Sequence, residues 1–231
     1  MTTTLITGAN KGLGRETARQ LIAAGHTVYA GARDEQRAKE AAAQLGARPI
    51  LIDVTSDESV RAAAELIRAE AGHLDVLVNN AGITGGRKEA GDITAADMLA
   101  VYDTNVFGVV RVMHAFLPLL EAAGAPAVVN VSSGMGSLAV TTDPSRFEST
   151  LISLPYTSSK SALNMVTTQY AKACPSIRIN AVDPGYTGTD LNDHRGTQTV
   201  EEGAEIIVRM AMTGADGPTG GFFSRSGPVP W

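Results

Sequence analysis

The chain has 231 residues, which is enough for one large domain with a sizeable core and too few for two comfortable ones. A formal net charge of −5 at pH 7 argues against nucleic acid or an anionic membrane surface as the main partner. Cys174 is the only cysteine, which excludes an intramolecular disulfide and a cysteine-based metal site. Met1 stands a few residues before the first predicted strand, and no apolar run approaches the roughly 18 residues that a membrane span requires. We therefore expect a cytoplasmic protein with no membrane or nucleic-acid partner.

A glycine-spaced turn follows the first apolar run. Leu5 and Ile6 lead into glycines at positions 8, 12 and 14, and the residues after them repeat with a helical period. This pattern predicts a strand, a tight turn and a helix, whose free N–H groups and positive dipole end suit a phosphate group. The spacing matches neither G-x-G-x-x-G nor the P-loop, so the turn by itself is equally compatible with a purely structural role.

Strands and helices then alternate along the rest of the chain. Strands are predicted at 27–30, 49–54, 75–79, 127–131 and 177–182, with a seventh, edge strand at 220–223. Helices are predicted at 34–46, 56–72, 94–123, 155–173 and 200–213, and an irregular tail at 214–231 is expected to lie along the surface. Strict alternation with short connections predicts a single α/β domain over residues 1–231, with a doubly wound parallel sheet of the Rossmann type.

The carboxyl ends of the predicted strands carry polar residues or glycines. They are Thr7-Gly8, Gly31-Ala32-Arg33, Asp53-Val54, Asn79-Asn80-Ala81-Gly82, Ser132-Ser133 and Asp183-Pro184-Gly185. Because ligands of a doubly wound sheet bind beyond these ends, one edge of the sheet is predicted to hold a long polar ligand.

The helix after the fifth strand carries Tyr156 and Lys160, which lie one turn apart on the same face. The pair carries little information alone, because Y-x-x-x-K occurs by chance in many proteins. Its context is more informative, since Ser133 ends the preceding strand at the same edge of the sheet.

These motifs occur in order and together resemble a classical short-chain dehydrogenase/reductase over essentially the whole chain. The motifs are Thr7-Gly8-x3-Gly12-x-Gly14, Asp53-Val54, Asn79-Asn80-Ala81-Gly82, Asn105, Ser133, Tyr156-x3-Lys160 and Pro184-Gly185. The turn at 7–12 and a long segment before Tyr156 are similar to the carbonyl-reductase branch. The resemblance implies reduction of a small ketone or aldehyde by a nicotinamide cofactor.

The resemblance also implies a role for each of four catalytic residues. Tyr156 would donate the proton and Ser133 would hold the carbonyl oxygen. Lys160 would hold the nicotinamide ribose and lower the pKa of Tyr156, since a nearby cation lowers a phenol pKa by roughly one to three units. Asn105 would hold a water that links Lys160 to solvent, a role compatible with an amide that satisfies a helix irregularity.

NADP is favoured over NAD. Where an NAD enzyme of this type has an acidic residue, the second strand ends in Gly31 and Ala32, followed by Arg33, and Lys11 lies nearby. Asp34 either reaches a ribose or caps the next helix, and we interpret it as the cap. The cofactor contacts implied by the resemblance are Gly8, Asn10, Lys11, Gly12, Leu13, Arg33, Asp53, Val54, Asn80, Ala81, Gly82, Tyr156, Lys160, Pro184, Gly185, Thr187 and Thr189.

Segment 137–155 is longer than the family pattern requires. Asp143-Pro144 is predicted to begin a helix with an apolar stripe at Phe147, Leu151 and Leu154. This helix is either a surface element or one wall of the substrate pocket, and it leaves open whether the protein is a monomer or a homo-oligomer. The short lid at 189–200 suggests a permissive pocket, with Met135, Tyr186 and Leu191 as lining residues.

Three alternatives to a carbonyl reductase remain. They are a catalytically idle NADP-binding redox sensor, a reductase of a conjugated C=C bond and a methyltransferase, although a methyltransferase has no need of the Tyr–Lys pair. The four histidines show no metal-ligand spacing, so no metal site is predicted; they are His26, His73, His114 and His194.

Overall fold

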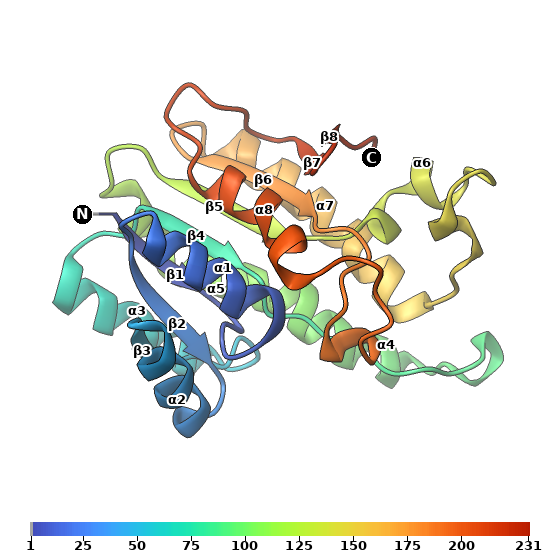
Figure 1. Cartoon of the computed structure of the whole chain (residues 1–231), viewed down its shortest axis with the longest axis horizontal. Coiled ribbons are helices and arrows are strands. Elements are labelled where there is room, and N and C mark those ends of the chain that lie inside the picture. The colour runs from blue at the N-terminus through green and yellow to red at the C-terminus, as the bar shows by residue number, and fades with distance from the viewer. Residues whose placement is uncertain (1) are drawn as a thin grey trace.

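A continuous eight-stranded sheet runs through the computed structural model, which describes residues 2–231 (Figure 1). Its spatial order is β3-β2-β1-β4-β5-β6-β7-β8, and all neighbouring strands are parallel except β7 and β8. The strands are β1 (Thr3–Ile6), β2 (Thr27–Ala32), β3 (Arg48–Leu51), β4 (Val76–Asn79), β5 (Ala127–Val131), β6 (Arg178–Asp183), β7 (Phe222–Ser224) and β8 (Gly227–Pro228). The predicted doubly wound α/β fold is confirmed.

Helices cover both faces of this sheet. They are α1 (Gly12–Ala23), α2 (Glu35–Leu45), α3 (Asp57–Ala71), α4 (Ala95–Tyr102), α5 (Gly108–Glu121), α6 (Leu138–Thr141), α7 (Leu154–Ala173) and α8 (Val200–Ala211). Leu77 of β4 packs in the apolar cluster beneath α3, α5 and α7, whereas its neighbour Val78 packs in the cluster beneath α1 and α8. Burial on both faces explains why the central strands are continuously apolar. Of the helices within residues 2–231, none is long and apolar enough to span a membrane.

Side-chain caps and glycines set the ends of several helices. The Asp34 carboxylate accepts a hydrogen bond from the Arg37 N–H at 2.8 Å, and α2 ends at Gly46 in the left-handed region. Ser56 caps the N-terminus of α3, and Gly72 ends this helix in the left-handed region. Asp34 is therefore the cap of α2, as predicted.

The long helix predicted at 94–123 is interrupted. A π-helical segment, Asp103–Phe107, separates α4 from α5 and turns the Asn105 side chain into the protein interior. The next residue, Gly108, packs against Val54, and a Cβ at this position would lie 2.9 Å from Val54 Cγ2. The interruption therefore occurs where the helix approaches the carboxyl ends of the strands.

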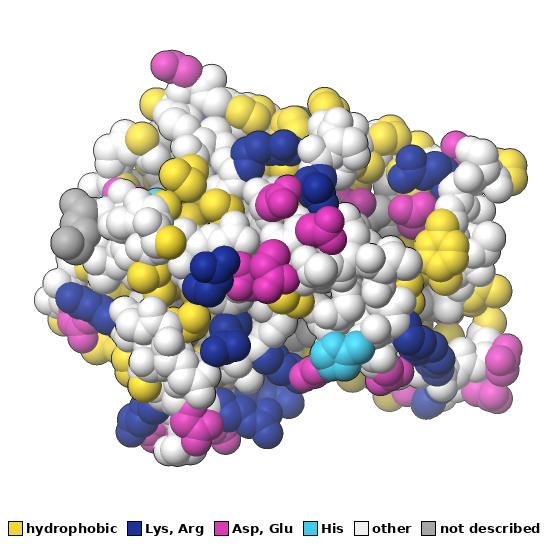
Figure 2. Space-filling view, viewed as in Figure 1, with side chains coloured by type: hydrophobic (Ala, Val, Ile, Leu, Met, Phe, Trp, Pro, Cys, Tyr) yellow, Lys and Arg dark blue, Asp and Glu magenta, His cyan; other side chains and the backbone are white. Residues whose placement is uncertain are grey.

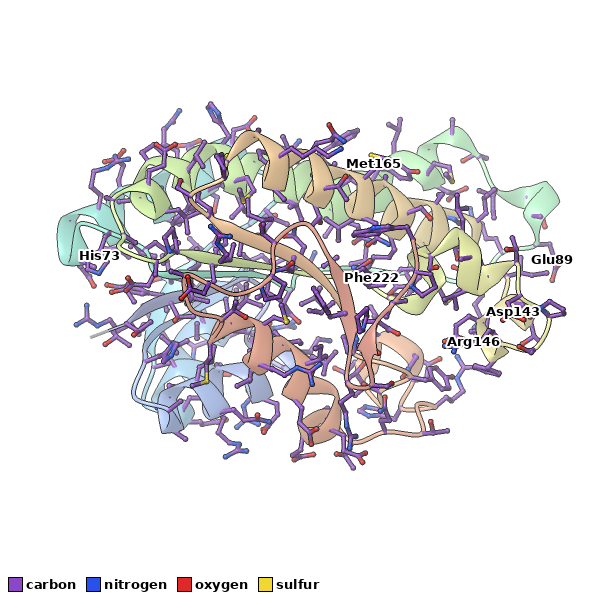
Figure 3. The ribbon with its side chains drawn as sticks, turned by 90° about the horizontal axis from the view of Figure 1, so that it is seen from above. His73, Glu89, Asp143, Arg146, Met165 and Phe222 are labelled. Carbon is purple, nitrogen blue, oxygen red and sulfur yellow. The ribbon has the colours of Figure 1, made fainter. Side chains whose placement is uncertain are left out.

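Segment 137–155 differs from its prediction. Asp143 does not begin a helix, because its carboxylate accepts hydrogen bonds from the N–H and hydroxyl of Ser145 in a local turn. The helix of this segment, α6, begins earlier and is capped by Ser137, and a 3-10 turn follows at Phe147–Thr150. Asp143 and Arg146 lie at the end of the molecule away from His73 (Figure 3).

The C-terminal tail is more ordered than expected. β8 pairs with β7, so β7 is not the edge strand of the sheet. Beyond β8, the Trp231 ring stacks on Phe222 with ring centres 5.5 Å apart. The Ser137 hydroxyl donates a hydrogen bond to the Pro230 carbonyl at 2.7 Å, which ties the tail to the segment that precedes α6.

Candidate active site

The glycine turn between β1 and α1 depends on close backbone approach. Gly8 and Gly12 have φ angles of +65° and +54°, which other residues rarely adopt. A Cβ on Gly14 would collide with the Asn80 side chain and with the Gly8 carbonyl. Lys11 is the N-cap of α1 and gives it no side-chain cap, and among the described residues no acidic side chain lies in the first turn. This helix end therefore fits a phosphate group.

The end of β4 holds this turn in place. The Thr7 hydroxyl accepts hydrogen bonds from the N–H groups of Asn80 and Ala81, both at 3.0 Å. In return, the Asn80 amide donates to the carbonyls of Thr7 and Gly8, at 2.9 and 3.0 Å. The predicted cofactor residues Gly8, Asn80 and Ala81 therefore lie together, and the Asn80 amide stabilises the glycine turn.

A cavity of about 310 Å³ opens beside the turn and is lined by Asn10, Lys11, Arg15 and Arg37, among others. Figure 2 shows basic side chains gathered near α2 on this side of the molecule. No motif in the sequence singles out Arg15 or Arg37, although Arg37 is only four residues after Arg33. Arg33 itself is exposed beyond the end of β2.

The segment after β6 folds back onto the glycine turn. The Lys11 ammonium lies 2.8 Å from one oxygen of Asp190, and the His194 ring lies 2.8 Å from the other. Hydrogen bonding and the charge of Lys11 lower the pKa of the Asp190 carboxyl. The short lid therefore meets the predicted phosphate site through Lys11, and Thr189 is within van der Waals distance of a Cβ placed on Gly12.

The other predicted cofactor residues lie at the same edge of the sheet. Asp53 ends the β3 region, where its carboxylate accepts hydrogen bonds from the N–H and hydroxyl of Thr55. Pro184 and Thr187 are buried, and Gly185 has a φ of +79°. A Cβ on Gly203 of α8 would collide with both Leu13 and Thr187, so this glycine lets two predicted cofactor residues come together.

Lys160 and Tyr156 lie on α7 beside the end of β5. The Lys160 side chain is 4% exposed, and its ammonium donates a hydrogen bond to the Val131 carbonyl at 2.7 Å. The same ammonium lies 5.6 Å from the centre of the Tyr156 ring. Tyr156 is half-buried, and Ser133 precedes the turn at Gly134–Gly136, where a Cβ on Gly136 would lie 2.8 Å from the main-chain carbon of Lys160. The fold thus brings together three of the four predicted catalytic side chains.

Burial dominates the protonation of this pair. Desolvation raises the pKa of Tyr156 to about 12, the Ser133 hydrogen bond lowers it, and the charge of Asp183 raises it. Desolvation also lowers the pKa of Lys160 to about 8. The expectation that Lys160 lowers the pKa of Tyr156 stays a prediction. A phenol of this pKa is protonated at neutral pH, as a proton donor must be.

The turn after β5 is fastened to α7. The Gly136 carbonyl accepts hydrogen bonds from the Asn164 amide and the Ser161 hydroxyl, at 3.1 and 2.9 Å. The Ser132 hydroxyl donates to the same Asn164 side chain at 2.6 Å. These contacts fix Ser133 relative to α7, and no motif in the sequence singles out Asn164 or Ser161 for this role.

Asn105 connects the loop after β4 to α7. Its amide oxygen accepts from the Ile83 N–H, and its amide nitrogen donates to the Ile83 carbonyl and the Ser159 hydroxyl, all within 2.9–3.0 Å. A Cβ on Gly82 would lie 3.4 Å from the Asn105 oxygen and 3.6 Å from the Lys160 ammonium. Asn105 thus satisfies the irregular backbone around it, and it lies across Gly82 from Lys160.

Comparison with known proteins gives the family. A family model described as "short chain dehydrogenase" matches residues 2–200. The protein belongs to the short-chain dehydrogenase family. It is 40% identical to the short-chain dehydrogenase anuI of Penicillium roqueforti, over 91% of this chain and 88% of that protein. It is 32% identical to a (+)-neomenthol dehydrogenase of Arabidopsis thaliana, over 96% and 95%. The solved structure of NADPH-bound carbonyl reductase from chicken fatty liver has a TM-score of 0.86 at 28% identity, covering 100% of this chain and 99% of that one.

The long segment of this short-chain dehydrogenase reaches its candidate active site. The Phe147 ring lies 5.7 Å from the Tyr186 ring, so the segment contacts the loop that follows β6. Phe147 and Leu154, two members of the predicted apolar stripe, are exposed to solvent. The two roles that the sequence leaves open for this segment, a surface element and one wall of the substrate pocket, stay predictions.

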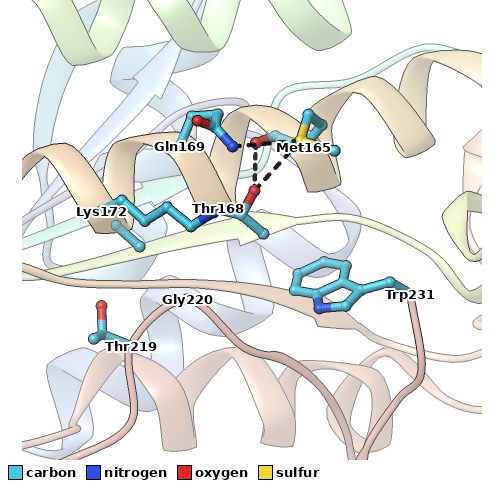
Figure 4. Close-up of a pocket in the computed structure, with 8 residues that line it drawn as sticks. Met165, Thr168, Gln169, Lys172, Thr219, Gly220 and Trp231 are labelled. Carbon is cyan, nitrogen blue, oxygen red and sulfur yellow. Dashed lines mark hydrogen bonds between the residues drawn. The ribbon is translucent and has the colours of Figure 1, made fainter.

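Two other observations concern possible binding sites of this short-chain dehydrogenase. Within residues 2–231, no group of three or more His, Cys, Asp or Glu side chains is arranged to hold a metal ion. A second cavity, of about 460 Å³, lies on the outer side of α7 between Met165, Lys172, Thr219 and Trp231 (Figure 4). It is separate from the edge of the sheet that carries the candidate site.

Proposed function

We propose that the protein reduces a ketone or aldehyde with NADPH, reversibly, and that Tyr156 donates the proton. The observation that carries this proposal is the buried ammonium of Lys160, 5.6 Å from the centre of the Tyr156 ring, on the helix to which the Ser133 turn is fastened. The names of the carbonyl reductase and the neomenthol dehydrogenase to which the chain is similar support a carbonyl–alcohol pair as substrate and product.

The residues of the chain divide the reaction between them. When bound, the nicotinamide supplies the hydride that reaches the carbonyl carbon. Ser133 donates a hydrogen bond to the carbonyl oxygen and holds it beside the phenol, where negative charge develops. Tyr156 transfers its proton to that oxygen. The positive charge of Lys160 stabilises the phenolate that this transfer leaves behind, and Asn105 orders the loop that faces it.

The preference for NADP rests on the cavity beside the glycine turn. Lys11, Arg15 and Arg37 line it, and cations of this kind bind a phosphate through charge-assisted hydrogen bonds. β2 ends in Gly31 and Ala32, so it offers no carboxylate to accept hydrogen bonds from the ribose hydroxyls. The nearby Asp34 carboxylate caps α2 instead. These features favour the 2′-phosphate of NADP over the free ribose of NAD.

Two alternatives predict different behaviour in one experiment. The protein is mixed with NADPH and a panel of ketones, aldehydes and conjugated enones, and the absorbance of the reduced nicotinamide is followed. Turnover of the ketones and aldehydes supports the proposal, and turnover of the enones with formation of saturated ketones indicates a C=C reductase. Tight NADPH binding without turnover of any compound indicates a redox sensor.

The variant Tyr156→Phe tests the proton donor. It retains the ring and loses only the hydroxyl, so we expect a loss of activity of about 100-fold or more, the usual contribution of a general acid. NADPH binding, measured by fluorescence, should stay within a few-fold of wild type. Unchanged turnover in this variant would refute the assignment of Tyr156.

A further inference from the structure

One side chain of α7 contacts the chain on both sides of Ser133. The Asn164 side chain is buried, and its amide oxygen accepts a hydrogen bond from the Ser132 hydroxyl at 2.6 Å. Its amide nitrogen donates to the Gly136 carbonyl at 3.1 Å. The oxygen and the nitrogen of one amide therefore hold the segment before and after the serine that we propose binds the substrate carbonyl.

The turn that follows Ser133 passes this attachment on to the Ser133 side chain. The Gly136 N–H donates to the Ser133 carbonyl at 2.8 Å, which closes the turn. Within the turn, the Ser133 hydroxyl oxygen accepts a hydrogen bond from the Met135 N–H at 3.2 Å. This bond uses a lone pair of the hydroxyl and leaves its proton for another acceptor. The position of the Ser133 hydroxyl is thus set by a turn whose last carbonyl is held by Asn164.

Asn164 also stands in a fixed relation to the two other proposed catalytic side chains on α7. It lies one helical turn after Lys160 and two turns after Tyr156. The Ser133 turn touches the helix at the same place, since a Cβ on Gly136 would lie 2.8 Å from the Cβ of Lys160. One amide therefore joins the Ser133 turn to the helix that carries the phenol and the ammonium.

We propose that Asn164 is a positioning residue of the active site, which holds the Ser133 hydroxyl in register with Tyr156 and Lys160. The proposal rests on the proposed function, in which Ser133 and Tyr156 act on the same carbonyl oxygen. Without the amide, the turn is free to move relative to α7. A displacement of about 1 Å at a reacting group can cost about 100-fold in rate, so a small movement of the turn slows the chemical step. None of the motifs that indicate the family includes this side chain.

Asn164→Ala tests the proposal, and Asn180→Ala is its matched control. Asn180 is also buried, and its amide likewise makes one hydrogen bond as acceptor, from the Gly221 N–H at 3.1 Å, and one as donor, to the Pro218 carbonyl at 2.8 Å. These contacts join β6 to the segment before β7 instead of holding the Ser133 turn. Both variants remove the same groups, so they should lose similar stability and differ only in the part of the fold that is released.

The first measurement is hydrogen exchange in the cofactor-free proteins. In Asn164→Ala, the amides of Met135 and Gly136 should exchange about three- to tenfold faster relative to the amides of β2 than in wild type, the effect of about one lost neutral hydrogen bond. In Asn180→Ala this ratio should equal that of wild type. An unchanged ratio in Asn164→Ala would overturn the proposal.

The second measurement is steady-state kinetics per folded enzyme. In Asn164→Ala, kcat should fall at least tenfold while the Kd for NADPH stays within a few-fold of wild type. In Asn180→Ala, kcat should stay within about twofold of wild type. An equal fall of kcat in both variants would mean that Asn164 contributes only stability, and would overturn the proposal as well.

If Asn164→Ala does not fold, Ser132→Ala provides the second variant. It removes one of the two contacts of Asn164 at the cost of a single oxygen atom, and the exchange ratio of Met135 and Gly136 should rise in the same direction; an unchanged ratio would count against the proposal. The exchange measurement needs neither substrate nor cofactor. A wild-type protein that turns over no carbonyl compound therefore contradicts the proposed function, whereas an active wild type with unchanged kcat in Asn164→Ala contradicts the role of Asn164.

Discussion

The ammonium of Lys160 donates a 2.7 Å hydrogen bond to the main-chain carbonyl of Val131 from a position that is only 4% exposed. Burial lowers the pKa of this lysine from its ordinary value of 10.5 to about 8. At neutral pH the folded protein therefore holds a cation that would be more stable in water. A buried cation that lowers the stability of the folded protein is typical of an active site.

The first prediction follows from this burial and concerns Lys160→Met. Below pH 8 Lys160 is charged in both the folded and the unfolded protein, so the whole cost of its desolvation lowers the free energy of unfolding of wild type. Between pH 8 and 10.5 the unfolded chain binds more protons than the folded one. Wild type should therefore gain about 3 kcal/mol relative to Lys160→Met as the pH rises from 7 to 10.5.

Urea unfolding of both proteins at pH 7 and at pH 10 measures this difference. Methionine cannot titrate, so changes in all other groups cancel when the two proteins are compared. A stability difference that stays constant over this pH range would mean that Lys160 is not desolvated as the structure has it.

The sequence predicted those parts of the site that depend on local pattern. The turn at Gly8 and Gly12 follows from backbone conformation, and the helical spacing of Tyr156 and Lys160 places both on one face of α7. The parallel sheet then brings the strand ends together, so Ser133 and the glycine turn meet at one edge without any information from distant residues.

Features that depend on contacts between distant residues could not be predicted. The π-helical segment exists where Asn105 bonds to Ile83 and Ser159, which are 22 and 54 residues away in the chain. The raised pKa of Tyr156 reflects burial, which a spacing of four residues to a lysine does not reveal. Asp143-Pro144 predicts a helix start because the turn of Asp143 with Ser145 uses the same side-chain chemistry as a helix cap.

The second prediction concerns the close approach of Gly136 to α7. A Cβ at this position would lie 2.8 Å from the main-chain carbon of Lys160, so Gly136→Ala must push the Ser133 turn away from the helix. We expect a loss of about 1–3 kcal/mol in stability, together with a fall in kcat of at least tenfold.

Gly124→Ala is the matched control for this prediction. Of the atoms that the structure describes, none lies within 4 Å of a Cβ at Gly124, and its stability and kcat should equal those of wild type. A Gly136→Ala enzyme with wild-type kcat would show that the position of Ser133 relative to α7 is not critical.

The third prediction concerns Asn105→Ala. The truncation leaves the Ile83 N–H and carbonyl without the side chain that satisfies them, which should lower the free energy of unfolding by about 1–3 kcal/mol. Hydrogen exchange at the Ile83 amide should accelerate by a larger factor than at amides of the distant strand β2. Equal acceleration at both places would contradict a local role of Asn105 in this loop.

The fourth prediction concerns the ion pair that joins the lid to the glycine turn. Lys11 is held by Asp190 at 2.8 Å, yet it also lines the cavity proposed for the 2′-phosphate of NADP. The two anions therefore compete for one ammonium, and Asp190→Ala should free Lys11 and lower the Kd for NADPH. Because both side chains are largely exposed, the gain should be modest, about two- to fivefold.

The measurement is a fluorescence titration of each protein with NADPH and with NADH at low and high salt. The improvement should appear for NADPH, shrink for NADH, which has no 2′-phosphate, and diminish as salt screens the charges. Asp193→Ala is the control, because this neighbouring carboxylate pairs with Arg195 instead of Lys11. Equal gains for both cofactors would place the effect of Asp190 in the opening of the lid, and weaker NADPH binding would contradict the competition for Lys11.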